Sequence, residues 1–187
     1  MIQFFKSLQL LSANDIQKIE GLPISLNIKK GKFLIQEGNI CNEIVLIKSG
    51  ILRSYYITDK GNEITNCITF ENELMSAFSS YITQKPTEEN IQAVVDTELW
   101  VLKRSDLEML YKSSLEWQKV GRYLTEMQYV EMEQRLVSFQ KHSAKQRYST
   151  LIEHHSYYIK LIPLKYLASY LGITTRHLSR LRSEISL

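Results

Sequence analysis

The stretch from Ile162 to Leu187 limits the fold of this chain most, because it has the pattern of two short helices joined by a tight turn. Pro163 suits the first position of the first helix, since proline has no N–H to leave unpaired there. Gly172 is expected to end this helix, because glycine adopts a positive φ at little cost. Apolar residues recur between them at helical spacing, at Leu164, Leu167, Ala168 and Leu171.

The second helix of this stretch combines an apolar face with a basic one. Thr174 offers its hydroxyl as an N-cap. A small residue, Ala168, precedes the turn glycine where two helices would cross, which completes the layout of a DNA-reading helix-turn-helix. An ordinary helical hairpin is the alternative, but the exposed basic face favours DNA binding. The expected inward residues are Leu178, Leu181 and Ile185, and the expected outward ones are Thr175, Arg176, Ser179, Arg180 and Ser183.

Charge is unevenly distributed along the chain. Residues 141–187 carry eight Lys/Arg against two Asp/Glu, whereas residues 1–140 carry fifteen against eighteen. A basic C-terminal unit beside a mildly acidic remainder is typical of a nucleic-acid reader attached to a second domain. The chain has no long apolar run and no signal-peptide pattern, and its two cysteines, Cys41 and Cys67, lack disulfide or metal spacing. We therefore expect a cytoplasmic protein without membrane spans.

The first hundred residues predict a short helical segment followed by a β-roll. Residues 1–22 have a helical pattern, with a cap at Ser12–Asp15. Glycine turns then separate β-rich runs, which suits an antiparallel, cupin-like jelly roll of roughly eight strands. A metal-binding cupin is excluded, because all four histidines follow the roll, and no metal site is expected. The expected strands cover residues 25–28, 32–36, 43–48, 51–57, 63–70, 91–95 and 98–102.

A long helical region is expected after the roll. Ser105–Glu108 resembles a capping box at its start, and a hinge is expected at residues 139–144. A further helix over residues 144–155 and a β-like connector over 157–161 would follow. The long helix has an apolar stripe that we expect to pair with a twin helix, although packing of the stripe on the roll is the alternative. The expected dimer residues are Val120, Leu124, Met127, Val130 and Val137.

A β-roll, a long helix and a helix-turn-helix, in this order, resemble the Crp/Fnr family of bacterial transcription regulators over nearly the whole chain. The similar segments are residues 29–39, 47–53 and 99–110 and, most specifically, Leu164–Arg182. The resemblance implies an α+β fold divided into a sensor domain (1–110), a long dimerisation helix (111–140) and a winged-helix-like helix-turn-helix domain (141–187). The wing is expected to be short or absent. Double-stranded promoter DNA and a second copy are the implied partners, and RNA polymerase is a further candidate.

Two stretches depart from the family members that bind cyclic AMP. Those members carry a Gly-Glu pair and an Arg-Ser/Thr pair that holds the phosphate. Here the corresponding residues 74–78 and 88–91 contain no glycine and no arginine, and Glu88 and Glu89 would repel a phosphate. We therefore expect a degenerate pocket without a cofactor. Two cysteines are too few for an iron–sulfur sensor, and no catalytic motif indicates an enzyme. A roll that does sense a small ligand, either a nucleotide or another molecule, and a dimeric protein-interaction scaffold remain the alternatives.

The reading helix also departs from the family. The resemblance places Arg176 at the position of a base-contacting glutamate of the family and Thr175 at that of a preceding arginine, whereas Arg180 matches the family's second arginine; this combination implies a different operator. Arg176 and Arg180 could each take the O6/N7 edge of a guanine. The other expected contacts are to the DNA backbone or support the helix, and they involve Thr174, Thr175, His177, Ser179, Arg182, Lys165 and Lys160.

Overall fold

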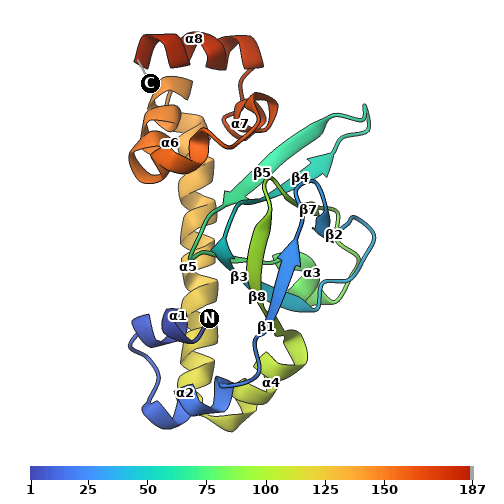
Figure 1. The fold of residues 1–187 in the computed structure, drawn as a ribbon, viewed down its shortest axis with the longest axis vertical. Helices are drawn as coiled ribbons and strands as arrows, with labels where there is room; N and C mark the ends of the chain where they lie inside the picture. The colour runs from blue at the N-terminus through green and yellow to red at the C-terminus, as the bar shows by residue number, and fades with distance from the viewer. Residues whose placement is uncertain (186–187) are drawn as a thin grey trace.

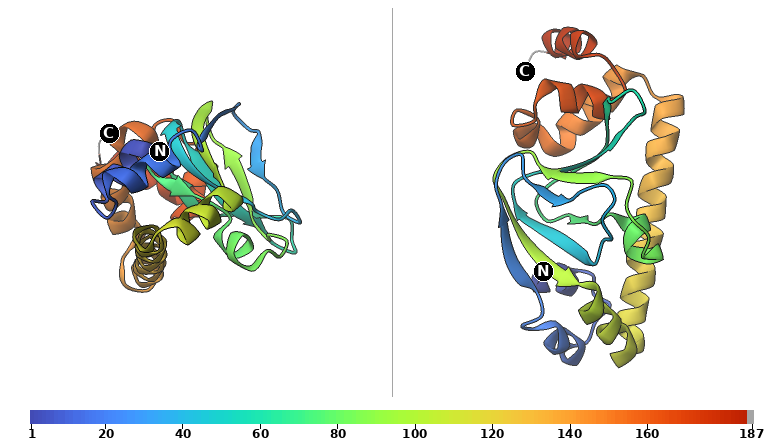
Figure 2. Two further views of the ribbon diagram at one scale, coloured as in Figure 1. Left: turned by 90° about the horizontal axis from the view of Figure 1, so that it is seen from below. Right: turned by 90° about the vertical axis from the view of Figure 1, so that its right-hand side faces the viewer.

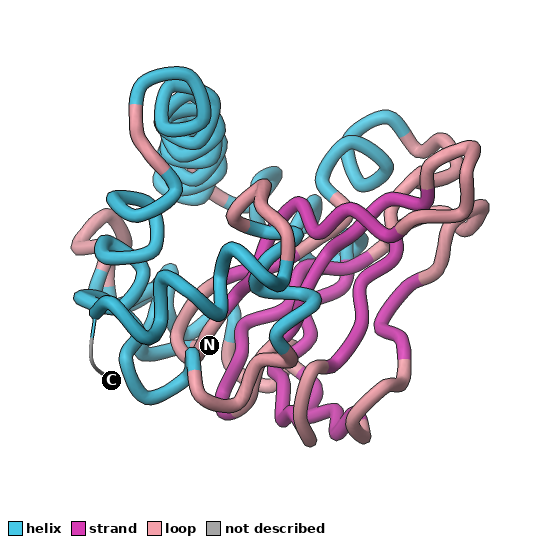
Figure 3. The backbone as a smooth tube through the Cα atoms, turned by 90° about the horizontal axis from the view of Figure 1, so that it is seen from above, coloured by secondary structure: helices cyan, strands magenta, loops and turns pink. Residues whose placement is uncertain are grey.

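The computed structural model describes residues 1–185, with side chains through Glu184. It has a β-roll, a long helix that runs past the roll, and a helical C-terminal unit at the far end of that helix (Figure 1, Figure 2). Seen from that end, the strands lie together on one side and the long helix on the other (Figure 3). None of the helices within residues 1–185 has the length and hydrophobicity needed to cross a membrane.

Two short helices, α1 (Ile2–Ser7) and α2 (Ala13–Ile19), begin the chain. The predicted cap of α2 is confirmed: the Oγ of Ser12 accepts the backbone N–H of Asp15 at 3.1 Å, and the Asp15 carboxylate accepts the N–H of Ser12. The hydrogen bond from Ser12 lowers the pKa of Asp15 to about 2. The backbone carbonyl of Asp15 in turn accepts the indole N–H of the fully buried Trp117 at 3.3 Å. This contact ties the N-terminal helices to the long helix.

The roll consists of two four-stranded antiparallel sheets, in the orders β1-β8-β3-β6 and β2-β7-β4-β5. All seven predicted β-rich runs are strands, which confirms the expected antiparallel roll. A two-residue strand and a short helix, α3 (Phe78–Thr83), were not predicted, because segments this short leave no readable period. The strands are β1 (Ile24–Ile28), β2 (Phe33–Ile35), β3 (Glu43–Ser49), β4 (Leu52–Ile57), β5 (Glu63–Thr69), β6 (Leu74–Met75), β7 (Asn90–Ala93) and β8 (Thr97–Lys103).

The helical region after the roll is divided into α4 (Arg104–Ser113) and α5 (Leu115–Lys141). The predicted capping box at Ser105–Glu108 is wrong: α4 follows β8 directly, Lys103 is its N-cap, and no side chain caps it. Glu108 instead forms an ion pair with Arg104. The break falls at Ser114, which has an extended backbone and accepts the N–H of Trp117 at its hydroxyl. The division of the chain at residues 110 and 140 stays a prediction.

The C-terminal unit contains α6 (Ala144–Ile159), α7 (Leu164–Tyr170) and α8 (Thr175–Ile185). A capping box at Ser143 begins α6, next to the expected hinge. The predicted β-like connector at residues 157–161 is wrong, because α6 kinks at His155 and then continues as helix to Ile159. Pro163 is the N-cap of α7 rather than its first helical residue, with ψ 136°. The side chain of Ile185, expected to face α7, lies outside the described part.

The C-terminal unit and the roll share one hydrophobic cluster. Tyr148, Leu167 and Leu178 are fully buried in it, together with Ile51 at the start of β4 and Phe70 at the end of β5. A separate cluster fills the roll itself and takes in the N-terminal helices and the first turns of α5. The helix-turn-helix is therefore packed against the body of its own chain and does not hang from α5 alone.

Candidate nucleic-acid interface

The turn between α7 and α8 has the predicted geometry. Gly172 adopts φ +67°, and the N–H of Ile173 donates to the carbonyl of Ala168 at 3.0 Å. The hydroxyl of Thr174 accepts the N–H of His177 at 3.2 Å and so caps α8. A Cβ at Gly172 would lie 2.7 Å from the ring of Phe139. Glycine is therefore required here both for its backbone conformation and for space.

Two arginines outside α8 secure the C-terminal end of α7. Arg147 donates to the carbonyl of Leu171 at 2.8 Å, and Arg135 donates to the carbonyl of Tyr170 at 3.2 Å. Both guanidinium groups also lie against the ring of Phe139. Cations at the C-terminal end of a helix satisfy its free carbonyls and complement its dipole. These two basic residues hold the motif together and are not available to DNA.

The outward face of α8 is exposed at the end of the molecule (Figure 1, Figure 3). Thr175, Arg176, Ser179 and Arg180 are all exposed, and so is Lys165 on α7. The Arg180 side chain is 71% exposed and its Nε lies 3.9 Å from the carboxylate of Glu184, a long contact that leaves the guanidinium free to move. Within residues 1–185, no ion pair involves Arg176. Two arginines one helical turn apart can thus reach a duplex.

Three of the other predicted contacts lie in different surroundings. Arg182 is half-buried, and its Nη2 atom is enclosed with no hydrogen-bond partner within the described residues, so it points into the protein. His177 is half-buried at the side of the helix. Lys160 is exposed at the C-cap of α6, away from α8 in sequence. The residues that share the exposed face are therefore a subset of those predicted.

The predicted dimer stripe is divided by the fold. Val120 is completely buried in the core of the roll and therefore cannot contact a partner chain as predicted, whereas Leu124 packs against that core and is partly buried. This part of the stripe packs on the roll, which was the alternative to pairing with a twin helix. Met127, Val130 and Val137 are 40%, 37% and 42% exposed.

A different side of α5 is more exposed than the predicted stripe. Tyr129, Met132 and Leu136 follow at i, i+3 and i+7 and are 62%, 63% and 60% exposed. The spacing is visible in the sequence, but α5 carries apolar residues on several sides and the spacing alone does not rank them. The fold decides which side is exposed, because the roll covers one side of α5 and leaves the side with Tyr129, Met132 and Leu136 open.

The two stretches that depart from the cyclic-AMP-binding members lie next to β6 and β7 of the roll. Residues 74–78 form β6 and the start of α3, and residues 88–91 lead into β7. The hydroxyl of Ser76 donates to the carbonyl of Glu43 at 2.9 Å, so it is already engaged. Glu89 is half-buried, burial raises its pKa, and a hydrogen bond from Ser54 opposes that rise. A carboxyl group in this position disfavours an anionic ligand.

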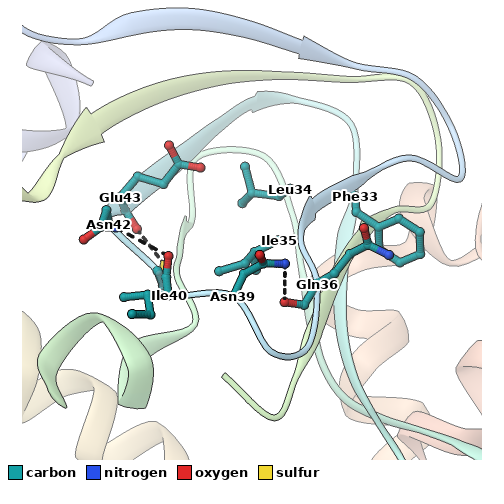
Figure 4. Close-up of a pocket in the computed structure, with 9 residues that line it drawn as sticks. Phe33, Leu34, Ile35, Gln36, Asn39, Ile40, Asn42 and Glu43 are labelled. Carbon is teal, nitrogen blue, oxygen red and sulfur yellow. Dashed lines mark hydrogen bonds between the residues drawn. The ribbon is translucent and has the colours of Figure 1, made fainter. Parts of the chain in front are cut away.

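Two cavities open on the roll. One, of about 350 Å³, lies beside the loop between β2 and β3 (Figure 4) and is lined by Phe33, Ile40 and Glu43 among others. The other, of about 510 Å³, lies between α3, α4 and α5, and Phe78 and Tyr81 are among the residues that line it. Within residues 1–185, no group of three or more His, Cys, Asp or Glu side chains is arranged to hold a metal ion.

Comparison with known proteins identifies the fold. Residues 25–114 match the family model of the cyclic nucleotide-binding domain. FixK2 from Bradyrhizobium japonicum superposes with a TM-score of 0.74 at 16% identity, covering 87% of this chain and 84% of that one. A protein from Eubacterium rectale assigned to the Crp/Fnr family of transcriptional regulators has a TM-score of 0.72 at 23% identity, covering 98% and 87%. The fold is that of the Crp/Fnr regulators.

The Crp/Fnr fold confirms the predicted resemblance and the α+β class. The global regulator CLP of Xanthomonas campestris, described as responsive to c-di-GMP, has a TM-score of 0.66 at 13% identity, covering 93% of this chain and 91% of its own. No curated protein sequence matches the chain. At these identities the structural comparisons establish the Crp/Fnr architecture alone.

Proposed function

We propose that this protein is a dimeric, sequence-specific DNA-binding transcription regulator. The observation that carries the proposal is the exposed basic face of α8, with Arg176 and Arg180 one turn apart at the end of a Crp/Fnr fold. The first helix of such a motif crosses the DNA backbone while the second enters the major groove. Arg176 and Arg180 read guanines, and Lys165, on α7, contacts phosphate.

The dimer forms along α5 through Tyr129, Met132 and Leu136. Residues 125–134 are all exposed, and three large apolar side chains among residues 129–136 are at least 60% exposed. Burying one side chain of this size stabilises an interface by about 1.5–3 kcal/mol. Met127, Val130 and Val137, which are less exposed, lie on another side of α5, outside this seam. A two-fold pair of α8 helices then reads two half-sites.

The roll does not use a cyclic-nucleotide phosphate as its anchor. Two features support this: no arginine lies in residues 88–91, and the Glu89 carboxyl is half-buried where a phosphate would approach. The effector, if the roll takes one, has different chemistry from cyclic AMP. A scaffold that binds only protein is the alternative, and it predicts no preferred DNA sequence.

Selection of bound duplexes from random-sequence DNA tests the proposal. We expect a palindromic operator with two half-sites about one helical turn, 10–10.5 base pairs, apart. Its binding should weaken steeply with salt, because phosphate contacts release counterions. Recovery of no preferred sequence, with equal binding of all duplexes, would exclude sequence-specific regulation.

A further inference from the structure

A charged residue of the roll is buried by the helix-turn-helix. Arg53, on β4, is 1% exposed, and its guanidinium lies between the rings of Tyr55, at 4.0 Å, and Tyr166, at 3.4 Å. Tyr55 belongs to the same strand, whereas Tyr166 belongs to α7. The guanidinium also donates to the carboxylate of Glu63 at 2.7 Å and to the amide oxygen of Gln92 at 2.9 Å. Stacking and hydrogen bonds thus enclose this cation from both domains.

Helix α7 also provides hydrogen bonds to the free edge of the sheet β2-β7-β4-β5. β5 is an edge strand, paired with β4 on one side only. On its open side, the backbone N–H of Thr65 donates to the hydroxyl of Ser169 at 2.9 Å, and that hydroxyl donates to the carbonyl of Glu63 at 3.3 Å. One serine of α7 therefore takes the place of a neighbouring strand at this point.

A second contact holds the other end of β5. The imidazole of His155, at the kink of α6, stacks on the ring of Phe70 with centroids 3.9 Å apart and planes 16° apart. The hydroxyl of Tyr158 donates to the carboxylate of Glu71 at 2.7 Å. α7 thus holds the start of β5 and α6 holds its end, while Arg135 of α5 adds the hydrogen bond to Tyr170 described above.

We propose that Arg53, Tyr166, Ser169 and the edge of β5 form an orienting latch, which fixes the direction of α8 relative to α5. The proposal rests on the proposed DNA-reading function. The latch orients α8 and does not block DNA binding, because the reading face of α8 stays exposed while these contacts are made. The apolar cluster shared by the roll and the C-terminal unit holds the two together, but hydrophobic contacts are non-directional. The hydrogen bonds and ring stacking of the latch are directional, and they fix the angle between the two.

Distance measurement within one chain tests the latch directly. Spin labels are placed at Lys32→Cys and Ser183→Cys, two exposed positions on the roll and α8, in a Cys67→Ser background because Cys67 is itself exposed. An excess of unlabelled protein keeps the measured pairs within one chain. Tyr166→Leu removes the ring from the guanidinium, Ser169→Ala removes the hydroxyl, and Tyr166→Phe is the matched control that keeps the ring. Circular dichroism verifies that each variant is folded.

We expect one narrow distance distribution in the wild type and in Tyr166→Phe, and a broadened one in Tyr166→Leu and Ser169→Ala. Operator affinity should fall about tenfold in the two broadened variants, a usual size for coupling between sites, with affinity for random DNA nearly unchanged. Unchanged distances in both variants overturn the latch, and broadened distances with full operator affinity overturn its orienting role. A wild type that selects no operator contradicts the proposed function alone, since the distances still decide whether the latch exists.

Discussion

Val120 and Met132 lie on different sides of α5, and the difference decides which of them can meet a second chain. Val120 has no exposed surface, whereas Met132 is 63% exposed. Both are apolar and both belong to a helix of 27 residues. The contrast arises because the roll packs on one side of the helix only.

The first prediction concerns the dimer. Met132→Glu together with Leu136→Glu should convert the protein to a monomer, because two pairs of like charges would face each other across the two-fold axis. We expect the dimer dissociation constant to rise at least about a hundredfold, equivalent to about 2.7 kcal/mol. Sedimentation velocity measures it. Met127→Glu is the matched control. A dimer lost in the control but kept in the double variant would show that the dimer forms through the side of α5 that carries Met127.

The second prediction concerns base reading. Arg180→Ala should cost about 1–3 kcal/mol on the selected operator and relax specificity at one base pair. Lys165→Ala should weaken binding to every duplex by a similar factor and lower the salt dependence by about one counterion. Fluorescence anisotropy on operator and scrambled DNA at several salt concentrations separates the two. Equal losses on both duplexes for both variants would contradict the assigned roles.

The third prediction uses two glycines with similar backbones. Gly172 (φ +67°) and Gly61 (φ +77°) both adopt the left-handed region, but a Cβ at Gly61 meets nothing within 4 Å, whereas at Gly172 it meets Phe139 at 2.7 Å. Gly61→Ala should therefore cost only the conformational strain, about 1–2 kcal/mol. Gly172→Ala should cost more than that. Urea unfolding gives both values, and equal costs would mean that Phe139 moves aside freely.

The fourth prediction concerns pH. Burial, followed by the nearby His154, lowers the pKa of His155 below its ordinary value of 6.5. As pH falls below about 6.5, the unfolded chain takes up a proton that the folded protein resists, so the free energy of unfolding should decrease with falling pH. His155→Phe keeps a ring against Phe70 and removes the titration.

The difference between wild type and His155→Phe isolates this effect, because neighbouring Glu73, whose pKa burial raises, titrates in both proteins. Urea midpoints between pH 5 and 8 measure it. A wild type that loses no more stability toward pH 5 than the variant would show that His155 is not responsible.

The fifth prediction concerns cyclic nucleotides. Millimolar cyclic AMP or cyclic GMP should leave the melting temperature unchanged, because the half-buried Glu89 disfavours a phosphate. A ligand at a hundred times its dissociation constant would add about 2.7 kcal/mol of stability. A rise of several degrees in a thermal-shift assay would therefore overturn this view of the pocket.

Local features were predicted well from the sequence. The turn at Gly172, the cap at Thr174 and the cap at Ser12 each depend on residues within a few positions of one another, and all three are confirmed. The roll was predicted because glycine turns separate its strands. The cap predicted at Ser105 failed because β8 continues directly into α4, which begins at Arg104, so that Ser105 already lies inside the helix.

Long-range features could not be predicted in the same way. Nothing near Arg53 in the sequence indicates that Tyr166 covers it, since the contact depends on how α7 packs against the sheet. The predicted seam of α5 is wrong at Val120 for a related reason: Val120 and Met132 are both apolar, and only the position of the roll separates the buried one from the exposed one. The arrangement of the domains decided both.

Ser169 also has a protective consequence. An edge strand with free amide groups can recruit a strand from another molecule and start intermolecular β-sheet growth. While the serine hydroxyl occupies the N–H of Thr65, that growth is blocked near the start of β5. Loss of the contact should therefore bring self-association and precipitation on storage, a cost to solubility that is separate from any change in gene control.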